Sequence, residues 1–176
     1  MSVTDTIYVK RAVTDYIIAA LKANRALDDV KLFVRGGLPP GMVPQDRYPF
    51  VEVMIAQETE DEEYTGNYYS QHYDGLLTVT VLSTQYARGD WLEHTGNRVA
   101  TVSSYDQVEE LVAHVVAELQ KSEHKDMGEL SVRDEVVTGF TVTGPRVFGI
   151  DHDSRTNSWE NFGSIPFSVA TQRRRE

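Results

Sequence analysis

The amino-acid sequence predicts a single α+β domain over residues 1–176. In it, two amphipathic helices pack on a mainly antiparallel β-sheet, and an extended hairpin arm projects at residues 56–75. Three observations predict this fold class. Two segments repeat nonpolar residues at helical spacing, the remaining segments alternate as strands do, and no low-complexity linker divides the chain. The order helix, strands, helix, strands is typical of an α+β domain built around one core.

Both helices are predicted from nonpolar residues that recur three and four positions apart. We expect the first helix to begin after the capping cluster at residues 4–6. It should end near Asn24, which tolerates the left-handed conformation of a helix stop. Its nonpolar face comprises Val9, Ala12, Val13, Tyr16, Ile17, Ala20 and Leu21. The second helix is expected to begin at Ser103, Ser104 or Asp106 and to end before Gly128. Its nonpolar face comprises Val108, Leu111, Val112, Val115, Val116 and Leu119.

Six segments have the alternation and composition of strands. They are residues 30–34, 48–55, 76–82, 130–137, 138–148 and 158–169. We expect the second and third to form a long antiparallel hairpin. Pro49 fits only at the start or the edge of its strand because it has no amide proton to donate. A short helix is considered near Asp90. Breaks are expected where Gly, Pro or polar residues gather, at 36–41, Gly139, 144–145 and 151–157.

The hairpin arm is the predicted interaction surface. Five of the six residues 58–63 are acidic, and such a run repels itself and favours an extended, solvated segment. Tyrosines follow, and they suit interfaces because they offer contact area and a polar tip; packing on their own sheet is the alternative. The C-terminal arginines have the charge to contact a neighbouring copy's acids. The candidate interface residues are Glu58, Glu60, Asp61, Glu62, Glu63, Tyr64, Tyr68, Tyr69, Arg173, Arg174 and Arg175.

Composition argues against several classes of function. The formal net charge of −10 disfavours nucleic-acid binding, which depends on Lys and Arg at phosphates. With no Cys, the chain forms no disulfide, thiolate metal site or thiol nucleophile. No nonpolar run approaches the roughly 18 residues of a membrane span, and the first ten residues do not resemble a signal peptide. We therefore expect a cytoplasmic chain with no membrane contact.

One cluster of potential metal ligands stands out, namely Asp151, His152 and Asp153. Carboxylate and imidazole groups could bind a metal ion, and a metal-dependent hydrolase is the alternative function this cluster suggests. Adjacent strand residues point in opposite directions, however, so a solvated polar turn is the favoured interpretation. His114 is interpreted as a structural helix residue. The Gly-x-Ser-x-Gly and phosphate-loop patterns are missing from the sequence, so we expect no enzyme and no cofactor.

A family resemblance rests on three strand segments and the order of the elements. The segments are Tyr48-Pro49-Phe50-Val51-Glu52-Val53, Gly75-Leu76-Leu77-Thr78-Val79-Thr80-Val81 and residues 159–169, Trp-Glu-Asn-Phe-Gly-Ser-Ile-Pro-Phe-Ser-Val. Together with the two amphipathic helices and the acidic insertion, they resemble the tail terminator proteins of long-tailed phages. Related neck and tail-completion proteins share this architecture. The likeness spans most of the chain, but the 58–73 and 83–102 segments are long for the family.

This resemblance implies a structural virion protein with no active site. The family's members form a ring, usually of six copies. The ring sits on the last ring of the tail tube, stops its polymerisation and binds the head connector at the tail-neck junction, after assembly in the host cytoplasm. DNA would pass through the bore without specific binding, because six chains carry a formal charge of about −60. A cellular adaptor remains a third hypothesis.

Overall fold

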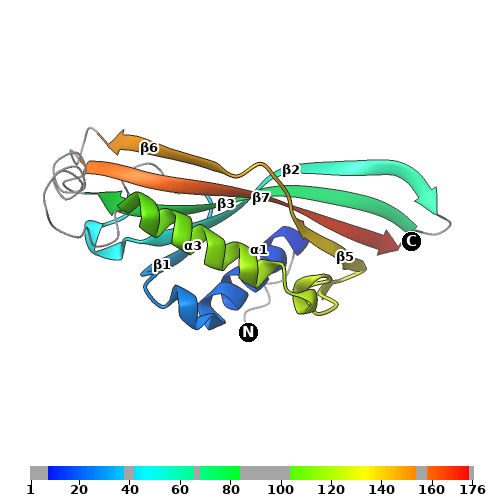
Figure 1. Cartoon of the computed structure of the whole chain (residues 1–176). Coiled ribbons are helices and arrows are strands. Elements are labelled where there is room, and N and C mark those ends of the chain that lie inside the picture. The colour runs from blue at the N-terminus through cyan, green and yellow to red at the C-terminus, as the bar shows by residue number, and fades with distance from the viewer. Residues whose placement is uncertain (1–7, 38–41, 66–67, 84–103, 154–157, 175–176) are drawn as a thin grey trace, which may run out of the picture.

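In the computed structural model, two α-helices lie on one face of a mixed seven-stranded sheet (Figure 1). The structure describes residues 8–37, 42–65, 68–83, 104–153 and 158–174. Within these ranges the strand order is β1-β2-β3-β7-β5-β4, and β6 pairs with β7 beside β5. The pair β1–β2 is parallel and the other pairs are antiparallel. The predicted α+β class, with two helices on a mainly antiparallel sheet, is therefore confirmed.

Helix α1 (Val9–Ala23) buries the face that the sequence predicts, with Val13, Ile17 and Leu21 fully inside. Tyr8 is the N-cap residue and contributes no side-chain cap; the predicted capping cluster lies outside the described residues. Asn24 ends the helix in an extended conformation, with φ of −86°, so the predicted left-handed stop is wrong. Its Oδ1 instead accepts a hydrogen bond from the Ala26 amide at 2.9 Å and begins a 3₁₀ turn, η1 (Arg25–Leu27).

Helix α3 (Ser104–Leu119) lies beside α1 and buries all six nonpolar residues predicted for its face. It ends at Leu119, well before Gly128, and a 3₁₀ turn, η3 (Ser122–His124), follows. Three residues after this turn, Met127, Gly128 and Glu129, have positive φ angles. Neither described helix is long and nonpolar enough to cross a bilayer.

The strands differ from the predicted segments mainly in length. They are β1 (Leu32–Arg35), β2 (Phe50–Thr65), β3 (Tyr68–Ser83), β4 (Ser131–Val132), β5 (Glu135–Val142), β6 (Val147–Asp153) and β7 (Ser158–Arg174), with a 3₁₀ turn η2 (Gln45–Arg47) before β2. The predicted break at Gly139 is wrong, because β5 continues through it with a register shift against β7. The predicted turn at 151–157 is wrong in its first three residues, which end β6. The possible helix near Asp90 lies outside the described residues.

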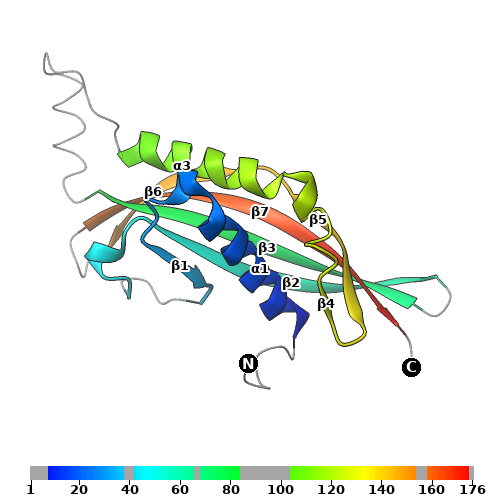
Figure 2. The ribbon, with the colours of Figure 1, turned by 90° about the horizontal axis from the view of Figure 1, so that it is seen from below.

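The hairpin β2–β3 is confirmed and is longer than predicted, and a third strand accompanies it. Strand β7 pairs with β3 along its whole length, from Trp159 opposite Ser83 to Arg174 opposite Tyr68. The predicted hairpin arm therefore has β7 along one side, and the three long strands extend beyond the helices (Figures 1 and 2).

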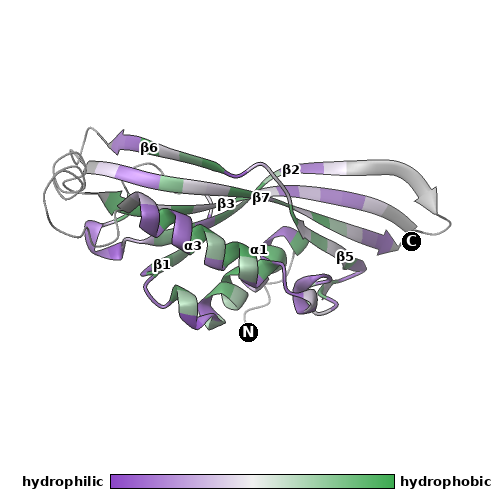
Figure 3. Cartoon of the chain, viewed as in Figure 1, coloured by the Kyte–Doolittle hydropathy of each residue, from purple (hydrophilic) through white to green (hydrophobic). Residues whose placement is uncertain are grey.

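The core lies between the helices and the inner sheet face (Figure 3). Along β7, the odd-numbered residues 161–171 are buried and the even-numbered ones are half-exposed. Strand β3 has the same alternation, with Leu77 and Val79 buried. Helix α3 packs so closely on β7 that a methyl group at Gly163 would lie 2.6 Å from Val112 Cγ2. Glycine at this position is what allows the helix to approach the sheet.

Candidate interaction surfaces

Backbone pairing brings the predicted interface tyrosines and arginines to one end of the sheet. Tyr69 is opposite Arg173 and also opposite Tyr64, while Tyr68 is opposite Arg174. The last predicted strand, residues 158–169, ends before these arginines, whereas β7 continues to Arg174. Of the remaining arm candidates, Glu60, Asp61, Glu62 and Glu63 lie on β2. The side chains of residues 60–69 and 174 are not described, and Arg175 lies outside the described residues.

Two of the predicted interface residues form ion pairs within the chain. Glu58 Oε2 lies 2.5 Å from Lys10 Nζ of α1, which ties the base of the arm to the helix. Arg173 Nε lies 3.1 Å from Asp134 Oδ2, and this hydrogen bond lowers the pKa of the Asp134 carboxyl. The side chain of Arg173 is still 45% exposed, so it remains accessible at the end of the sheet.

Both ion pairs border a pocket of about 300 Å³ between the start of α1 and strands β2, β3, β7 and β5. Tyr73 is buried in its wall, and its hydroxyl donates to Glu135 Oε1 at 2.7 Å. Thr171 Oγ1 donates to the same oxygen at 2.6 Å. Burial and the adjacent Glu135 carboxylate raise the pKa of Tyr73 well above its ordinary value. Tyr73 therefore packs on its own sheet. The pocket is lined by Tyr8, Val9, Lys10, Glu58, Gln71, Tyr73, Val132, Arg133, Asp134, Glu135 and Arg173.

The sheet face away from α1 and α3, here called the open face, carries nonpolar side chains across several strands. One cross-strand row consists of Met54, Leu76 and Pro166. Val147 on β6 is 54% exposed and lies opposite Ser164 in the adjacent row, which is polar on β2, β3 and β7. Phe162 is half-exposed on the same face and lies over Gly149. No helix in the described part of the chain covers these residues (Figure 1).

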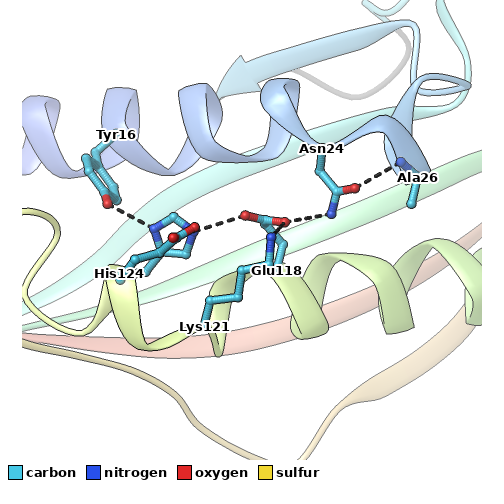
Figure 4. A network of polar contacts seen from close by, with 7 residues as sticks. Tyr16, Asn24, Ala26, Glu118, Lys121 and His124 are labelled. Carbon is cyan, nitrogen blue, oxygen red and sulfur yellow. Dashed lines mark hydrogen bonds and ion pairs between the residues drawn. The ribbon is translucent and has the colours of Figure 1, made fainter.

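A polar network links the ends of the two helices (Figure 4). Glu118 is 5% exposed, and its Oε2 accepts from Asn24 Nδ2 at 2.8 Å and from Lys121 Nζ at 2.7 Å. Its Oε1 lies 3.0 Å from His124 Nε2, and His124 Nδ1 lies 2.9 Å from the Tyr16 hydroxyl. Burial raises the pKa of Glu118, but the hydrogen bonds from Lys121 and His124 outweigh it, so the net pKa is lowered.

The sequence interpretation missed this network, although a signal was present. Glu118 follows Leu111 by seven positions and Val115 by three, which places a carboxylate on the nonpolar face of the helix. A buried carboxylate needs compensating donors, and those donors come from residues distant in the sequence. Tyr16 and Asn24 belong to α1 and its C-cap, far from Glu118 along the chain.

The structure separates two members of the predicted ligand cluster at the end of β6. Asp151 and His152 are successive strand residues, so their side chains lie on opposite faces. The His152 ring packs against Trp159, with centroids 4.7 Å apart, and Asp151 Oδ1 accepts from the His152 amide. The side chain of Asp153 is not described. His114 lies 3.7 Å from Glu110, one turn earlier on α3.

Within the described ranges, the group of three potential ligands that does converge comprises Glu118, Glu123 and His124. One ligand atom from each lies within 4.8 Å of the others. Glu118 and His124 are buried, whereas the Glu123 side chain is 67% exposed. The group therefore opens to solvent on one side.

Comparisons with known proteins find little likeness. No protein-family model matches this chain, and no curated protein matches it. One matching solved structure is described as "Virion of native gene transfer agent (GTA) particle". The match has a TM-score of 0.47 and 11% sequence identity, and it covers 93% of this chain and 98% of that chain. A likeness this distant does not establish a shared role.

Proposed function

We propose that this chain is a structural virion protein, a tail terminator of a long-tailed phage. In this proposal, six copies form a ring at the tail-neck junction. One side of the ring caps the last ring of tail-tube protein, and the other binds the head-tail connector. The protein acts through its surfaces and performs no chemical step. The support comes from the fold, from its uncovered surfaces and from the family resemblance of the strand segments.

The open face is the observation that carries the proposal. A sheet that packs helices on one face needs a second layer, or water and polar side chains, on the other. Here the row Met54, Leu76 and Pro166 and the neighbouring Val147 put nonpolar surface on that side. Nonpolar surface that spans several strands is typical of a protein-protein interface. A ring supplies the missing layer from another chain.

Strand β2 offers a second surface along its edge. Strand β1 pairs only with Phe50–Val53, so no described strand pairs with the outer edge of β2 beyond that point. The acidic residues on this outer part oppose indiscriminate pairing with other sheets, as charged residues do on many edge strands. A specific partner with basic residues would still fit, and the C-terminal arginines of a neighbouring copy have that charge.

The negative charge of the chain supports the expectation that DNA passes through the ring without binding to it. Each chain carries −10, so a ring of six carries about −60. An acidic ring repels the phosphate backbone, which lets DNA pass through a bore without binding to its wall. DNA is therefore a passing molecule in this proposal and not a ligand.

A tube-capping assay tests the proposed function. Purified tail-tube protein is allowed to polymerise with and without this chain, and tube lengths and bound protein are measured by electron microscopy and sedimentation. We expect the wild-type protein to bind tube ends and to stop growth. Binding to connector rings but never to tubes would assign the chain to another neck protein. Binding to neither would overturn the proposal.

A matched pair of variants tests the open face in the same assay. Met54→Lys puts a charge on the open face, whereas Met42→Lys makes the same change at an exposed methionine before η2. We expect Met54→Lys to lose ring formation and capping, because a buried unpaired charge opposes association. Met42→Lys should behave as wild type. Equal assembly of the two variants would show that the open face is not an interface.

A further inference from the structure

We propose that Glu118, Glu123 and His124 form a binding site for a zinc ion or a similar divalent transition-metal ion. The site lies where α3 ends and η3 follows it, close to the end of α1 (Figure 4). It is separate from the open face and from the arm, and it does not depend on the proposed virion function.

The distances between the ligand atoms fit a metal ion. His124 Nε2 lies 3.0 Å from Glu118 Oε1 and 3.6 Å from Glu123 Oε1. Zinc binds imidazole nitrogen and carboxylate oxygen at about 2.0–2.2 Å. Two ligands at that distance are separated by about 3.0 Å at a right angle and about 3.4 Å at a tetrahedral angle. The ligand atoms of Glu118 and Glu123 lie within 4.8 Å of each other. An ion bound to His124 Nε2 and Glu118 Oε1 is therefore within reach of the exposed Glu123 side chain, which moves to complete the site.

The surrounding residues orient the two buried ligands. A metal-binding histidine usually donates its other ring N–H to a fixed partner, and here the Tyr16 hydroxyl lies 2.9 Å from His124 Nδ1. The second oxygen of Glu118 is held by Asn24 and Lys121, which leaves Oε1 directed toward His124. Tyr16 belongs to α1, Asn24 caps its end, and Lys121 lies between α3 and η3. The packing of α1 against the end of α3 therefore holds the ligands in place.

Charge and ligand type select the kind of ion. Glu118 and Glu123 supply two negative charges, and Lys121 at the far oxygen of Glu118 supplies one positive charge. The remaining negative charge attracts a divalent cation. The side chain of Lys121 is 52% exposed, so water screens its repulsion of the ion. One imidazole and two carboxylates suit zinc, cobalt or nickel better than magnesium or calcium, which prefer oxygen ligands alone.

A bound ion would connect the end of α3 to η3. Glu118 belongs to the last turn of α3, and Glu123 and His124 belong to the following 3₁₀ turn. Because the three ligands converge only in the folded chain, the ion would bind the native state and raise the melting temperature. The three protein ligands leave room for a water molecule in a fourth position.

Titration of the untagged, chelator-treated full chain with zinc chloride tests this inference. Calorimetry should show one ion per chain, and cobalt should give a visible absorption band typical of a nitrogen-oxygen ligand set. Glu123→Gln should weaken zinc binding at least tenfold without affecting the fold, because this side chain is largely exposed. His124→Asn should abolish binding.

His114→Asn is the matched control, since His114 is also paired with a glutamate on α3. We expect it to bind zinc as the wild type does, and circular dichroism establishes that each variant is folded. Absence of zinc binding by the wild type would overturn the inference. Binding that Glu123→Gln leaves unchanged would overturn it as well. If the wild type does not bind zinc, His124 serves only as a hydrogen-bond partner of Glu118.

Discussion

At the residue scale, the Glu135 carboxylate joins three strands beneath the pocket. Tyr73 of β3 and Thr171 of β7 both donate to Glu135 of β5. A partly buried carboxylate without such donors would lose hydration and gain nothing in return. The hydroxyl groups of Tyr73 and Thr171 therefore link β3 and β7 to β5 through Glu135.

Removal of the Tyr73 hydroxyl tests this account. We expect Tyr73→Phe to lower the free energy of unfolding by about 1–3 kcal/mol, because Glu135 loses a donor in a partly buried site. Tyr8→Phe is the control, since Tyr8 is 68% exposed, and its effect should be within about 0.5 kcal/mol. Urea denaturation measures both values. Equal effects of the two variants would contradict the assigned role of Tyr73.

The Asp134–Arg173 pair predicts a pH dependence. The hydrogen bond from Arg173 lowers the pKa of Asp134 below its ordinary value of 3.8, so the folded protein favours the charged carboxylate. The pair therefore stabilises the fold above about pH 4 and loses this contribution as the pH falls through the lowered pKa.

Comparison of the wild type with Asp134→Asn measures this contribution. The wild type should have the higher urea midpoint at pH 6 and low salt, and the difference should disappear at about pH 2. High salt should also reduce the difference, because both groups are solvent-exposed. A difference that grows as the pH falls would have the wrong sign for this pair.

At the scale of elements, the contact between α3 and β7 depends on Gly163. A methyl group there would meet Val112 and, at 3.1 Å, Val108. We expect Gly163→Ala to destabilise the protein by about 1–3 kcal/mol, as overpacked cores usually are. Gly139→Ala in β5 is the control, because its nearest neighbour would be Ala170 Cβ at 3.8 Å. Thermal unfolding of the two variants checks the prediction, and a more stable Gly163→Ala would refute close packing here.

The helices could be predicted because their nonpolar faces repeat locally, and both faces are buried as expected. Strand lengths could not, because the outer part of β2 is acidic and lacks the alternation that reveals a half-buried strand. The pairing of β3 with β7 joins residues far apart in the sequence, so it has no local signal. The sequence predicts a strand break at Gly139, where the structure has a register shift within β5. Glycine is common both at bulges and at strand ends, so the sequence does not separate the two.

In the candidate sites too, the residue types could be predicted from the sequence, but their positions relative to one another could not. The sequence identified the tyrosines and arginines as interface candidates, but only the β3–β7 register places them at one end of the sheet. The converging group around Glu118 could not be assembled from the sequence, because its partners come from α1, from the C-cap of α1 and from the segment after α3. The Asp151 and His152 pair, which looked denser in the sequence, is separated by strand alternation.

At the scale of the whole molecule, the fold is an asymmetric layer, with helices on one face and partly nonpolar surface on the other. The long strands extend past the helices and carry acidic and aromatic residues at their far end. Such a molecule has unlike surfaces on its two sides, and a closed ring lets each copy use both without continued growth. Assembly should therefore be the property on which its function depends.

Native mass spectrometry of the purified chain tests this central claim most directly. A chain of 19.9 kDa should form a discrete ring, near 119 kDa for six copies, alone or after addition of tail-tube protein. Met54→Lys should remain at the mass of one chain, while Met42→Lys should form the ring. A wild-type protein that stays at 19.9 kDa at every concentration, with and without tail-tube protein, would contradict the account.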